Sequence, residues 1–389
     1  MSRLKDYLRK IIKPKYESLN VIKIETQKII ANYNYLKQEQ RGAEIIPVLK
    51  SNAYGHGLKE VCQILNQTSA KLVAVDSFPE AQIVWRYFKG KVLILNEMPL
   101  KVYSYCRLAR TEFVVYSQAV LKHLAKYGEA AKVHLFYNTG MNREGIKDLA
   151  EFLKVNESSL KKVKVTGFCS HLSSAEEETI INQDQEDKFL AGLLALREQG
   201  LYPTWVHLGN SASVFKSRNS LLTAYRAGLA LYGYSPFAGQ VKDPLAGKSY
   251  LRPALSLYST ITHLQTLQGD EAVSYNADYI TNQETKIAII PLGYFEGLDR
   301  RLSNQAQFIA IPTHKPQERV WARVAGKVCM NLTCLDLGLR EIRVGDRVLV
   351  ISPQTEDPNS VQNLAKIMGT ISYEVLVKLQ ANIRREIIW

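Results

Sequence analysis

Short apolar runs rich in Val, Ile and Leu recur between residues 45 and 227, and amphipathic stretches separate most of them. Their length and composition predict eight strands, near Ile45–Leu49, Leu72–Asp76, Val92–Asn96, Phe113–Tyr116, Val133–Tyr137, Lys164–Cys169, Trp205–Leu208 and Ala224–Ala227. Apolar residues at helical spacing predict helices over Leu58–Leu65 and Asn182–Gln199. Because strands and helices alternate, the strands should be parallel, and eight such units are typical of a TIM (β/α)8 barrel.

After residue 250 the helical spacing becomes sparse, and apolar runs alternate with Gly, Asn and Asp turns. Strands are predicted near Ala254–Thr262, Lys286–Pro291, Gln307–Ile311 and Arg347–Ser352, and one helix over Asn359–Met368. We therefore expect an α/β fold with a (β/α)8 barrel at residues 20–250, followed by a mostly β C-terminal domain at residues 251–389.

Residues 1–19 are a basic extension ahead of the predicted barrel, with Asp6 as the one acid before Tyr16. The spacing of Leu4, Leu8 and Ile11 predicts a short amphipathic helix packed on the barrel. A transit peptide or a helix on a membrane surface is the alternative interpretation. A secretory signal is not expected, because the apolar central region of such a signal is missing.

The composition of the 389 residues, with 46% hydrophobic and 22% charged residues, is that of a globular protein. No uninterrupted run of about 18 apolar residues is present, so we expect no transmembrane helix and no membrane partner. The net charge is +13, but the basic residues are spread out and no nucleic-acid-binding motif accompanies them, which argues against a nucleic-acid partner. The five cysteines are odd in number and lack C-x-x-C spacing, which argues against a disulfide framework or a metal site and favours a cytoplasmic location.

Polar residues follow the predicted strands at the end where a barrel carries its site. They are Lys50, Asn138, Arg143, His171, Asn210, Ser211 and Arg226. A lysine, a histidine and two arginines at one mouth suit an anionic ligand that carries an aldehyde. Lys50 would form a Schiff base if neighbouring cations and burial removed its proton. The alternative is a solvated lysine at the end of a strand.

The segment Val48–Gly57, which reads VLKSNAYGHG, closely resembles the pyridoxal-phosphate (PLP) attachment motif of alanine racemases. The resemblance continues in order at Asn138–Arg143, Ser170–His171, Gly209–Ala212, Arg226–Gly233, Val273–Tyr275, Pro291–Tyr294, Cys329–Met330 and Ile371–Val375. It covers residues 20 to 389. The chain therefore resembles a family of PLP-dependent isomerases that interconvert L- and D-alanine. The resemblance implies that the reaction supplies D-alanine for the bacterial cell wall.

The resemblance implies a mechanism with two bases, Lys50 and Tyr275, on opposite faces of the substrate. Proton removal on one face and delivery on the other inverts the carbon. His171 and Arg226 would contact Tyr275 and favour its phenolate. Arg226 would also face the pyridine nitrogen and leave it unprotonated, because the pKa of arginine exceeds about 12. The alternatives are a packed strand tyrosine at Tyr275 and a core histidine at His171.

The resemblance also assigns the binding residues. The cofactor would be held by Lys50, Tyr54, His171, Asn210, Ser211, Arg226, Gly228, Leu229 and Tyr373. The substrate, a small amino acid, would be bound by Arg143, Met330 and Tyr294. In the family the tyrosine and the Cys-Met segment come from the partner subunit, which implies a homodimer with shared active sites.

Four residues depart from the family pattern. Phe136 stands where many members have a carbamylated lysine bonded to the substrate-binding arginine, so the resemblance assigns no anchor to Arg143. Asn138 and Asn331 stand where aspartate is usual. Asn276 replaces a glycine, and asparagine tolerates a positive φ better than most residues.

Three other functions remain open at the level of sequence. One is a racemase for another amino acid, such as serine. The second is a related PLP decarboxylase, although such enzymes place a glutamate at the ring nitrogen where this chain has Arg226. The third is a PLP-binding protein of a single barrel, against which the additional domain with Tyr275 argues.

Overall fold

The computed structural model describes residues 17–389, except 41, 218, 238–244 and 246–249. The helix predicted between Met1 and Tyr16 lies outside the described residues. The chain forms two compact units. The barrel unit contains Lys23–Ser256, Ile351–Ala381 and Arg385–Trp389, and the β unit contains Leu257–Val350, Asn382–Arg384 and the described residues up to Ile22. The predicted division at residue 250 stays a prediction.

All eight predicted strands of the barrel are present. They are β2 (Glu44–Pro47), β3 (Leu72–Val75), β4 (Lys91–Ile94), β5 (Thr111–Val115), β6 (Lys132–Phe136), β7 (Lys164–Cys169), β8 (Trp205–His207) and β9 (Ala224–Ala227). Strands β3 to β8 pair in parallel in sequence order, and β2 pairs in parallel with β9. A parallel bridge between Val48 and Ala74 connects β2 to β3. The predicted barrel fold is therefore confirmed.

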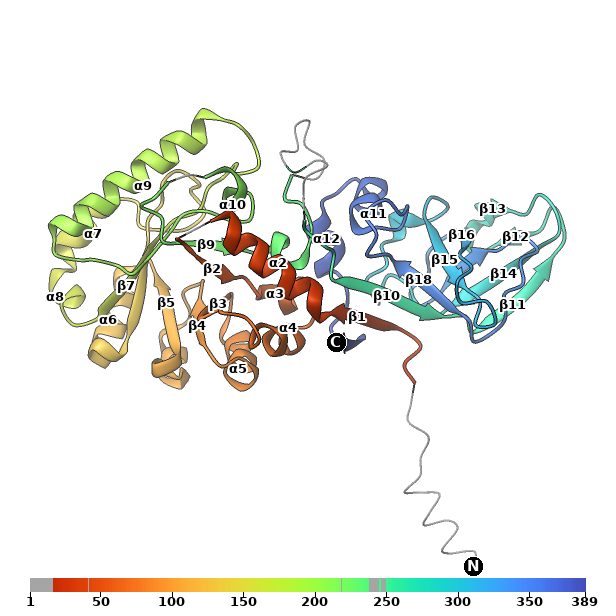
Figure 1. The fold of residues 1–389 in the computed structure, drawn as a ribbon, viewed down its shortest axis with the longest axis horizontal. Coiled ribbons are helices and arrows are strands. Elements are labelled where there is room, and N and C mark those ends of the chain that lie inside the picture. The colour runs from red at the N-terminus through yellow and green to blue at the C-terminus, as the bar shows by residue number, and fades with distance from the viewer. Residues whose placement is uncertain (1–16, 41, 218, 238–244, 246–249) are drawn as a thin grey trace, which may run out of the picture. The chain divides into compact units, whose positions relative to one another are not determined.

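Helices follow most of these strands and cover the outside of the barrel (Figure 1). They are α2 (Thr26–Glu39), α4 (Leu58–Leu65), α5 (Phe78–Tyr87), α6 (Gln118–Leu124), α7 (Leu149–Val155), α8 (Glu157–Leu160), α9 (Ile180–Glu198) and α10 (Ser213–Lys216), with α11 (Val361–Met368) and α12 (Ser372–Val377) in the later part of the barrel unit. The helix α4 coincides with its prediction, because Val61, Ile64 and Leu65 bury one face. No helix in the described part of the chain has the length and apolarity needed to cross a membrane.

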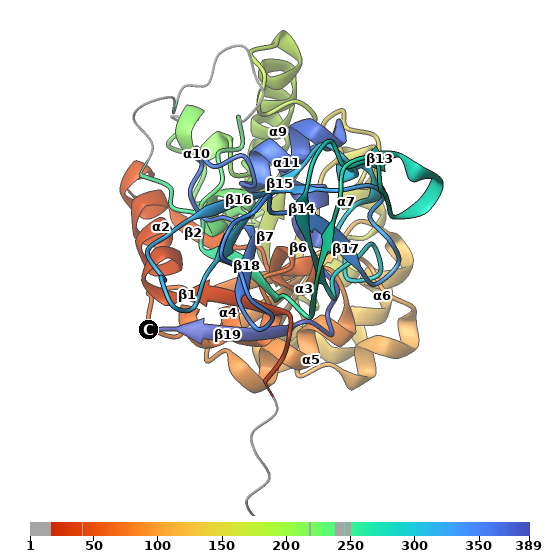
Figure 2. The ribbon, with the colours of Figure 1, turned by 90° about the vertical axis from the view of Figure 1, so that its right-hand side faces the viewer.

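The β unit is mostly antiparallel (Figure 2). Its strands include β10 (Leu255–Thr260), β11 (His263–Leu267), β14 (Thr285–Ile290), β15 (Gln307–Ile311), β16 (Val320–Val324), β17 (Thr333–Asp336) and β18 (Arg347–Ile351), hydrogen-bonded in the order β11-β14-β17-β16-β15-β18-β10. A separate hairpin pairs β12 (Ala272–Val273) with β13 (Tyr279–Ile280). Strands β1 (Val21–Glu25) and β19 (Arg384–Ile388) lie where the chain passes from one unit to the other. The predicted mostly β architecture is confirmed.

Candidate active site

Lys50 opens a short left-handed turn at the end of the first barrel strand. The four residues Ser51 to Tyr54, which the secondary structure assigns to α3 (Lys50–Tyr54), have φ values between 53° and 56°. Non-glycine residues pay about 1–2 kcal/mol each for this conformation, and such strain concentrates at functional sites. The turn is held by Leu58 N–H, which donates to Asn52 Oδ1 at 2.8 Å, and by Ser51 N–H, which donates to Glu80 Oε1 at 2.6 Å.

The amine of Lys50 is available for chemistry. Its side chain is 38% exposed, and its nearest ionic partner is Asp76, with 3.8 Å between Nζ and Oδ1. That separation is long for a hydrogen bond. Lys50 is therefore positioned by the backbone of the turn and keeps a reactive end.

Tyr54, Ser211, Gly228, Leu229 and Tyr373 together form a set of hydrogen-bond donors in the barrel unit. Ser211 Oγ accepts hydrogen bonds from Gly228 N–H at 3.0 Å and from Ala230 N–H at 3.3 Å, which leaves the hydroxyl proton to donate. A Cβ on Gly228 would lie 2.4 Å from the Tyr54 hydroxyl, so glycine is required beside Tyr54. The ring of Tyr373 packs 5.9 Å from that of Tyr54.

Two features make this set suitable for a phosphate. Burial raises the pKa of Tyr54 to about 12, so its hydroxyl stays protonated and able to donate. Neither the Tyr54 hydroxyl nor the Leu229 N–H has a recorded partner among the described residues. Asn210 Oδ1 accepts from Ala212 N–H at 2.9 Å, so this side chain shapes the turn that carries Ser211.

Arg226 lies buried at the end of β9 and contacts His171. Its Nη2 donates to His171 Nδ1 at 3.0 Å and to the carbonyl oxygen of Ser170 at 2.6 Å. Burial, then the positive charges of Arg226, Arg143 and Lys50, lowers the pKa of His171 to about 3. His171 is therefore neutral, and the three predicted cations act on it at one mouth of the barrel.

Arg143 has a carboxylate partner that the sequence analysis missed. Glu144 receives two hydrogen bonds from the guanidinium, from Nε at 2.5 Å and from Nη2 at 2.6 Å. This bidentate contact raises the pKa of Arg143. Phe136 instead packs edge-on against Tyr116, with ring centroids 6.4 Å apart. The sequence contained a signal for this contact. Glu144 directly follows Arg143, and Phe136 stands where many family members have the lysine that anchors this arginine.

The asparagine at position 138 organises the loop before Arg143. Asn138 Oδ1 accepts from Gly140 N–H at 3.0 Å and from Asn142 N–H at 3.1 Å, while its Nδ2 donates to Asn142 Oδ1 at 2.9 Å. An aspartate would accept the first two bonds but not donate the third. Asn138 therefore fits the role of a loop anchor.

The β unit carries Tyr275, Tyr294 and Met330 close together. Ser274 Oγ, next to Tyr275, lies 3.5 Å from Cys329 Sγ, and Tyr294 N–H donates to the Cys329 carbonyl at 3.0 Å. All three side chains are exposed, Tyr275 by 64%. The structure therefore divides the predicted site residues between the units.

The two asparagines of the β unit fit their surroundings. Asn276 has φ 65°, a left-handed conformation that asparagine adopts at lower cost than most residues. Asn331 Nδ2 donates to Glu296 Oε1 at 2.9 Å, a contact that an ionised aspartate would replace with repulsion.

Three buried polar residues inside the barrel were not predicted from the sequence. His207 accepts from Arg226 Nη1 at 2.6 Å, and His134 and Glu112 continue the contact away from the site. Each of the three lies within a strand whose other residues are mainly apolar. A histidine or glutamate inside such a run was the signal for them.

The residues present fit PLP. The barrel unit offers an amine for an aldehyde, hydroxyl and amide donors for a phosphate, and a buried guanidinium. The absence of a side chain at Gly228 lets the Tyr54 hydroxyl lie close to the backbone that carries these donors. Clustered backbone and hydroxyl donors of this kind suit phosphate groups.

Comparisons with known proteins agree on one family. The family model described as alanine racemase, N-terminal domain, matches residues 24–236, and the model for the C-terminal domain matches residues 254–387. The chain is 32% identical over 351 residues to the alanine racemase of Clostridium perfringens, covering 88% of each chain. It is 29% identical over 371 residues to that of Clostridium tetani, covering 93% of each.

Solved structures of the same family are similar in fold. The alanine racemase of Bacillus anthracis with bound L-Ala-P is 27% identical, with a TM-score of 0.84 and coverage of 96% of both chains. The alanine racemase of Enterococcus faecalis is also 27% identical, with a TM-score of 0.84 and coverage of 95% of this chain and 98% of the other.

Proposed function

Since this chain belongs to the alanine racemase family, we propose that it interconverts L- and D-alanine with PLP as cofactor. The observation that carries the proposal is the contact of buried Arg226 with neutral His171, beside the charges of Arg143 and Lys50. Lys50, Arg143 and Arg226 all act on His171, which is the set needed to hold an anionic cofactor and a carboxylate substrate.

When bound, PLP acidifies the Cα–H of an attached amino acid and delocalises the resulting charge. Tyr54, Ser211 and the Leu229 N–H would hold its phosphate, with Tyr373 packed against Tyr54. Lys50 would hold its aldehyde carbon. The Tyr54 hydroxyl donates because burial raises its pKa to about 12.

Arg143 is the group that would bind the substrate carboxylate. Its Nε and Nη2 are already occupied by Glu144, which fixes the plane of the guanidinium. The remaining Nη1 is the donor left for the carboxylate. Arg143 would therefore meet the substrate as a pre-oriented cation, which reduces the entropy lost on binding.

Inversion of the carbon requires one base on each face. The Lys50 amine would move a proton on one face, and the Tyr275 hydroxyl would move a proton on the other. Tyr275 is 64% exposed, and exposed Phe295, Met330 and Leu332 accompany it in the β unit. Exposed apolar side chains that gather at one place are typical of an interface. We therefore expect a homodimer in which Tyr275 serves the site of a second copy.

The cysteines support a proposal for the cellular location. All five are free, in agreement with a reducing compartment. We expect the enzyme to act in the cytoplasm on a small amino acid.

The test is incubation of the enzyme with L-alanine in D2O, followed by chiral analysis and mass spectrometry. We expect D-alanine that carries deuterium at Cα. With Tyr275→Phe, racemisation should fall by about 10²- to 10⁴-fold, while Lys50 still exchanges the α-hydrogen of one enantiomer. A wild-type enzyme that forms neither D-alanine nor deuterated alanine would end the proposal.

A further inference from the structure

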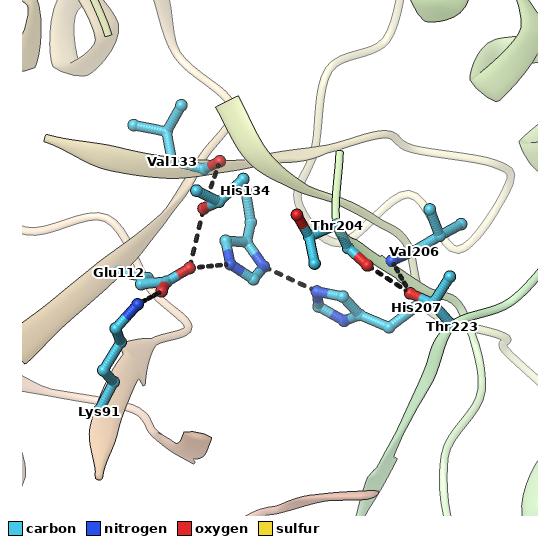
Figure 3. Close-up of polar contacts among 9 residues, drawn as sticks. Lys91, Glu112, Val133, His134, Thr204, Val206, His207 and Thr223 are labelled. Carbon is cyan, nitrogen blue, oxygen red and sulfur yellow. Dashed lines mark hydrogen bonds and ion pairs between the residues drawn. The ribbon is translucent and has the colours of Figure 1, made fainter. Parts of the chain in front are cut away.

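A chain of buried hydrogen bonds runs from the candidate site through the interior of the barrel. Arg226 Nη1 contacts His207 Nδ1 at 2.6 Å, and His207 Nε2 lies 2.8 Å from His134 Nδ1. His134 Nε2 lies 2.9 Å from Glu112 Oε2, and Lys91 Nζ reaches Glu112 Oε1 at 3.0 Å (Figure 3). Both histidines are fully buried, whereas Lys91 is partly exposed. These hydrogen bonds therefore connect the candidate site to Glu112, near the start of strand β5.

The neighbouring barrel strands leave space for these hydrogen-bonded side chains. A Cβ on Gly167 of β7 would lie 2.2 Å from His134 Cγ and Nδ1, so only glycine admits the imidazole there. The register between β6 and β7 shifts between Val133 and His134, beside the same ring. The hydroxyl of Thr166 donates to Glu112 Oε2 at 2.8 Å. The glycine, the register shift and the threonine hydroxyl therefore accommodate a polar network inside an otherwise apolar barrel.

The donor and acceptor roles along the chain have one solution. Arginine only donates, so His207 Nδ1 accepts and His207 Nε2 carries the proton. His134 Nδ1 then accepts, and His134 Nε2–H donates to the Glu112 carboxylate. Every N–H in the series points away from the site and toward Glu112.

The charge states agree with this solution. Burial opposes ionisation of Glu112, but hydrogen bonds from His134, Lys91 and Thr166 outweigh it and hold the pKa of Glu112 at about 2. Burial lowers the pKa of His134 and lowers that of His207 well below its ordinary value. Both histidines are therefore neutral, and Glu112 is an anion.

These hydrogen bonds determine which N–H group of Arg226 remains for a ligand. Nη1 donates to His207 Nδ1 and to the His207 carbonyl at 2.7 Å. Nη2 donates to the carbonyl of Ser170, to His171 Nδ1 and to the carbonyl of Leu208. For Nε, the structure records no partner among the residues that it describes. The Nε–H is thus the donor that Arg226 has left for a ligand.

We propose that Glu112 is a positioning residue that acts through His134 and His207 to fix Arg226 with only its Nε–H left for the ring nitrogen of the cofactor. The proposal rests on the proposed function and adds residues remote from the substrate. Without an acceptor at Glu112, either imidazole is released to turn over and present N–H where N was. An N–H of His207 facing Arg226 would place two donors against each other, and the guanidinium would have to move.

A matched pair of variants at His134 tests whether the hydrogen bonds between Glu112 and Arg226 position the guanidinium. In His134→Gln the side chain still accepts from His207 and donates to Glu112, whereas in His134→Met a side chain of nearly the same size does neither. The first readout is the ¹⁵N spectrum of the histidines in the enzyme without cofactor, which separates the two neutral forms of His207. The second is the ¹⁵N shift of the ring nitrogen of bound PLP, and the third is the division of the effect between kcat and KM.

With His134→Gln, the His207 ¹⁵N signals and the ring-nitrogen shift of bound PLP should both match the wild type. With His134→Met, the His207 Nε2–H loses its buried acceptor, so the His207 ¹⁵N signals and the ring-nitrogen shift should both move, and kcat should fall about tenfold with little change in KM, as for one broken buried hydrogen bond. Wild-type His207 signals, ring-nitrogen shift and kcat in a folded His134→Met protein would overturn the proposal and leave the network a structural one.

Two further results keep the test decisive. If His134→Met does not fold, Glu112→Gln, which keeps the acceptor and removes the charge, is measured in the same way. In Glu112→Gln, His207 should keep its Nε2–H form. Loss of that form in this variant would contradict the positioning role of Glu112. If the wild type binds PLP but does not racemise alanine, the proposed function fails, while both ¹⁵N readouts still judge the positioning role.

Discussion

Arg143 and Glu144 form an ion pair between neighbours in sequence at the mouth of the barrel. The carboxylate takes two N–H groups of the guanidinium, and Phe136 packs apart from it against Tyr116. The family pattern supplies a negative partner to this arginine from a modified lysine. In this chain Glu144 supplies the negative charge without any modification.

This contact leads to a prediction for Glu144→Gln. The guanidinium loses its charged anchor, and ordering it on binding costs about 0.5–1.5 kcal/mol, so KM for alanine should rise about 2- to 10-fold with a smaller change in kcat. Steady-state kinetics at low salt measure both constants. Glu198→Gln, at an exposed position at the end of α9, is the control. A KM equal to that of the control would contradict the anchoring role.

At the scale of elements, the barrel strands combine apolar packing with buried histidines. His134 and His207 lie on β6 and β8, His171 follows β7, and His56 follows the turn after Lys50. The pKa of each is lowered, chiefly by burial, to about 4 for His56 and about 3 for His171. The folded protein therefore resists protonation of these four rings.

The stability of the protein should consequently fall in acid. Unfolded histidines take up protons below their ordinary pKa of 6.5, while the folded ones do not until about pH 4 for His56 and about pH 3 for His171. Unfolding thus binds protons, and each such histidine removes up to about 1.4 kcal/mol of unfolding free energy per pH unit below 6.5. Urea denaturation from pH 7.5 to pH 5 measures the slope.

The same experiment has an internal comparison. His56→Phe removes one of the four rings, so its slope should be flatter than that of the wild type. His263→Asn changes an exposed histidine of the β unit and serves as the control. Equal slopes for the wild type and His56→Phe would show that His56 does not contribute.

Strands and helices were predictable from sequence where one face is buried. The eight barrel strands and α4 follow from short apolar runs and helical spacing, and the predicted strands at Gln307–Ile311 and Arg347–Ser352 are also present. Strand β11 was missed because most of its residues are exposed. Helix α12 was missed because it is a short element without a repeating apolar pattern.

The site was predictable in its parts more than in its connections. Lys50, Arg226 and His171 followed from their places after strands and from motifs. The left-handed turn after Lys50 and the contact of His134 with Glu112 depend on tertiary packing. No periodicity in sequence reports a hydrogen bond between two strands, so such contacts appear only when the strands are paired.

At the scale of the whole molecule, the proposed reaction requires groups from both units. Lys50 belongs to the barrel unit, and Tyr275 to the β unit. Exposed Tyr275, Phe295, Met330 and Leu332 give the β unit an apolar surface that suits a second copy. A two-fold dimer would then contain two equivalent sites, each with Lys50 from one copy and Tyr275 from the other.

The most direct test of this account is complementation between two inactive variants. Lys50→Ala and Tyr275→Phe are each purified, mixed in equal amounts, allowed to exchange subunits and assayed for racemisation of alanine. If each site takes Lys50 and Tyr275 from different copies, the mixed dimer contains one intact site, and about a quarter of the wild-type activity per chain should return. A mixture that exchanges subunits but remains as inactive as its two components would contradict the shared site.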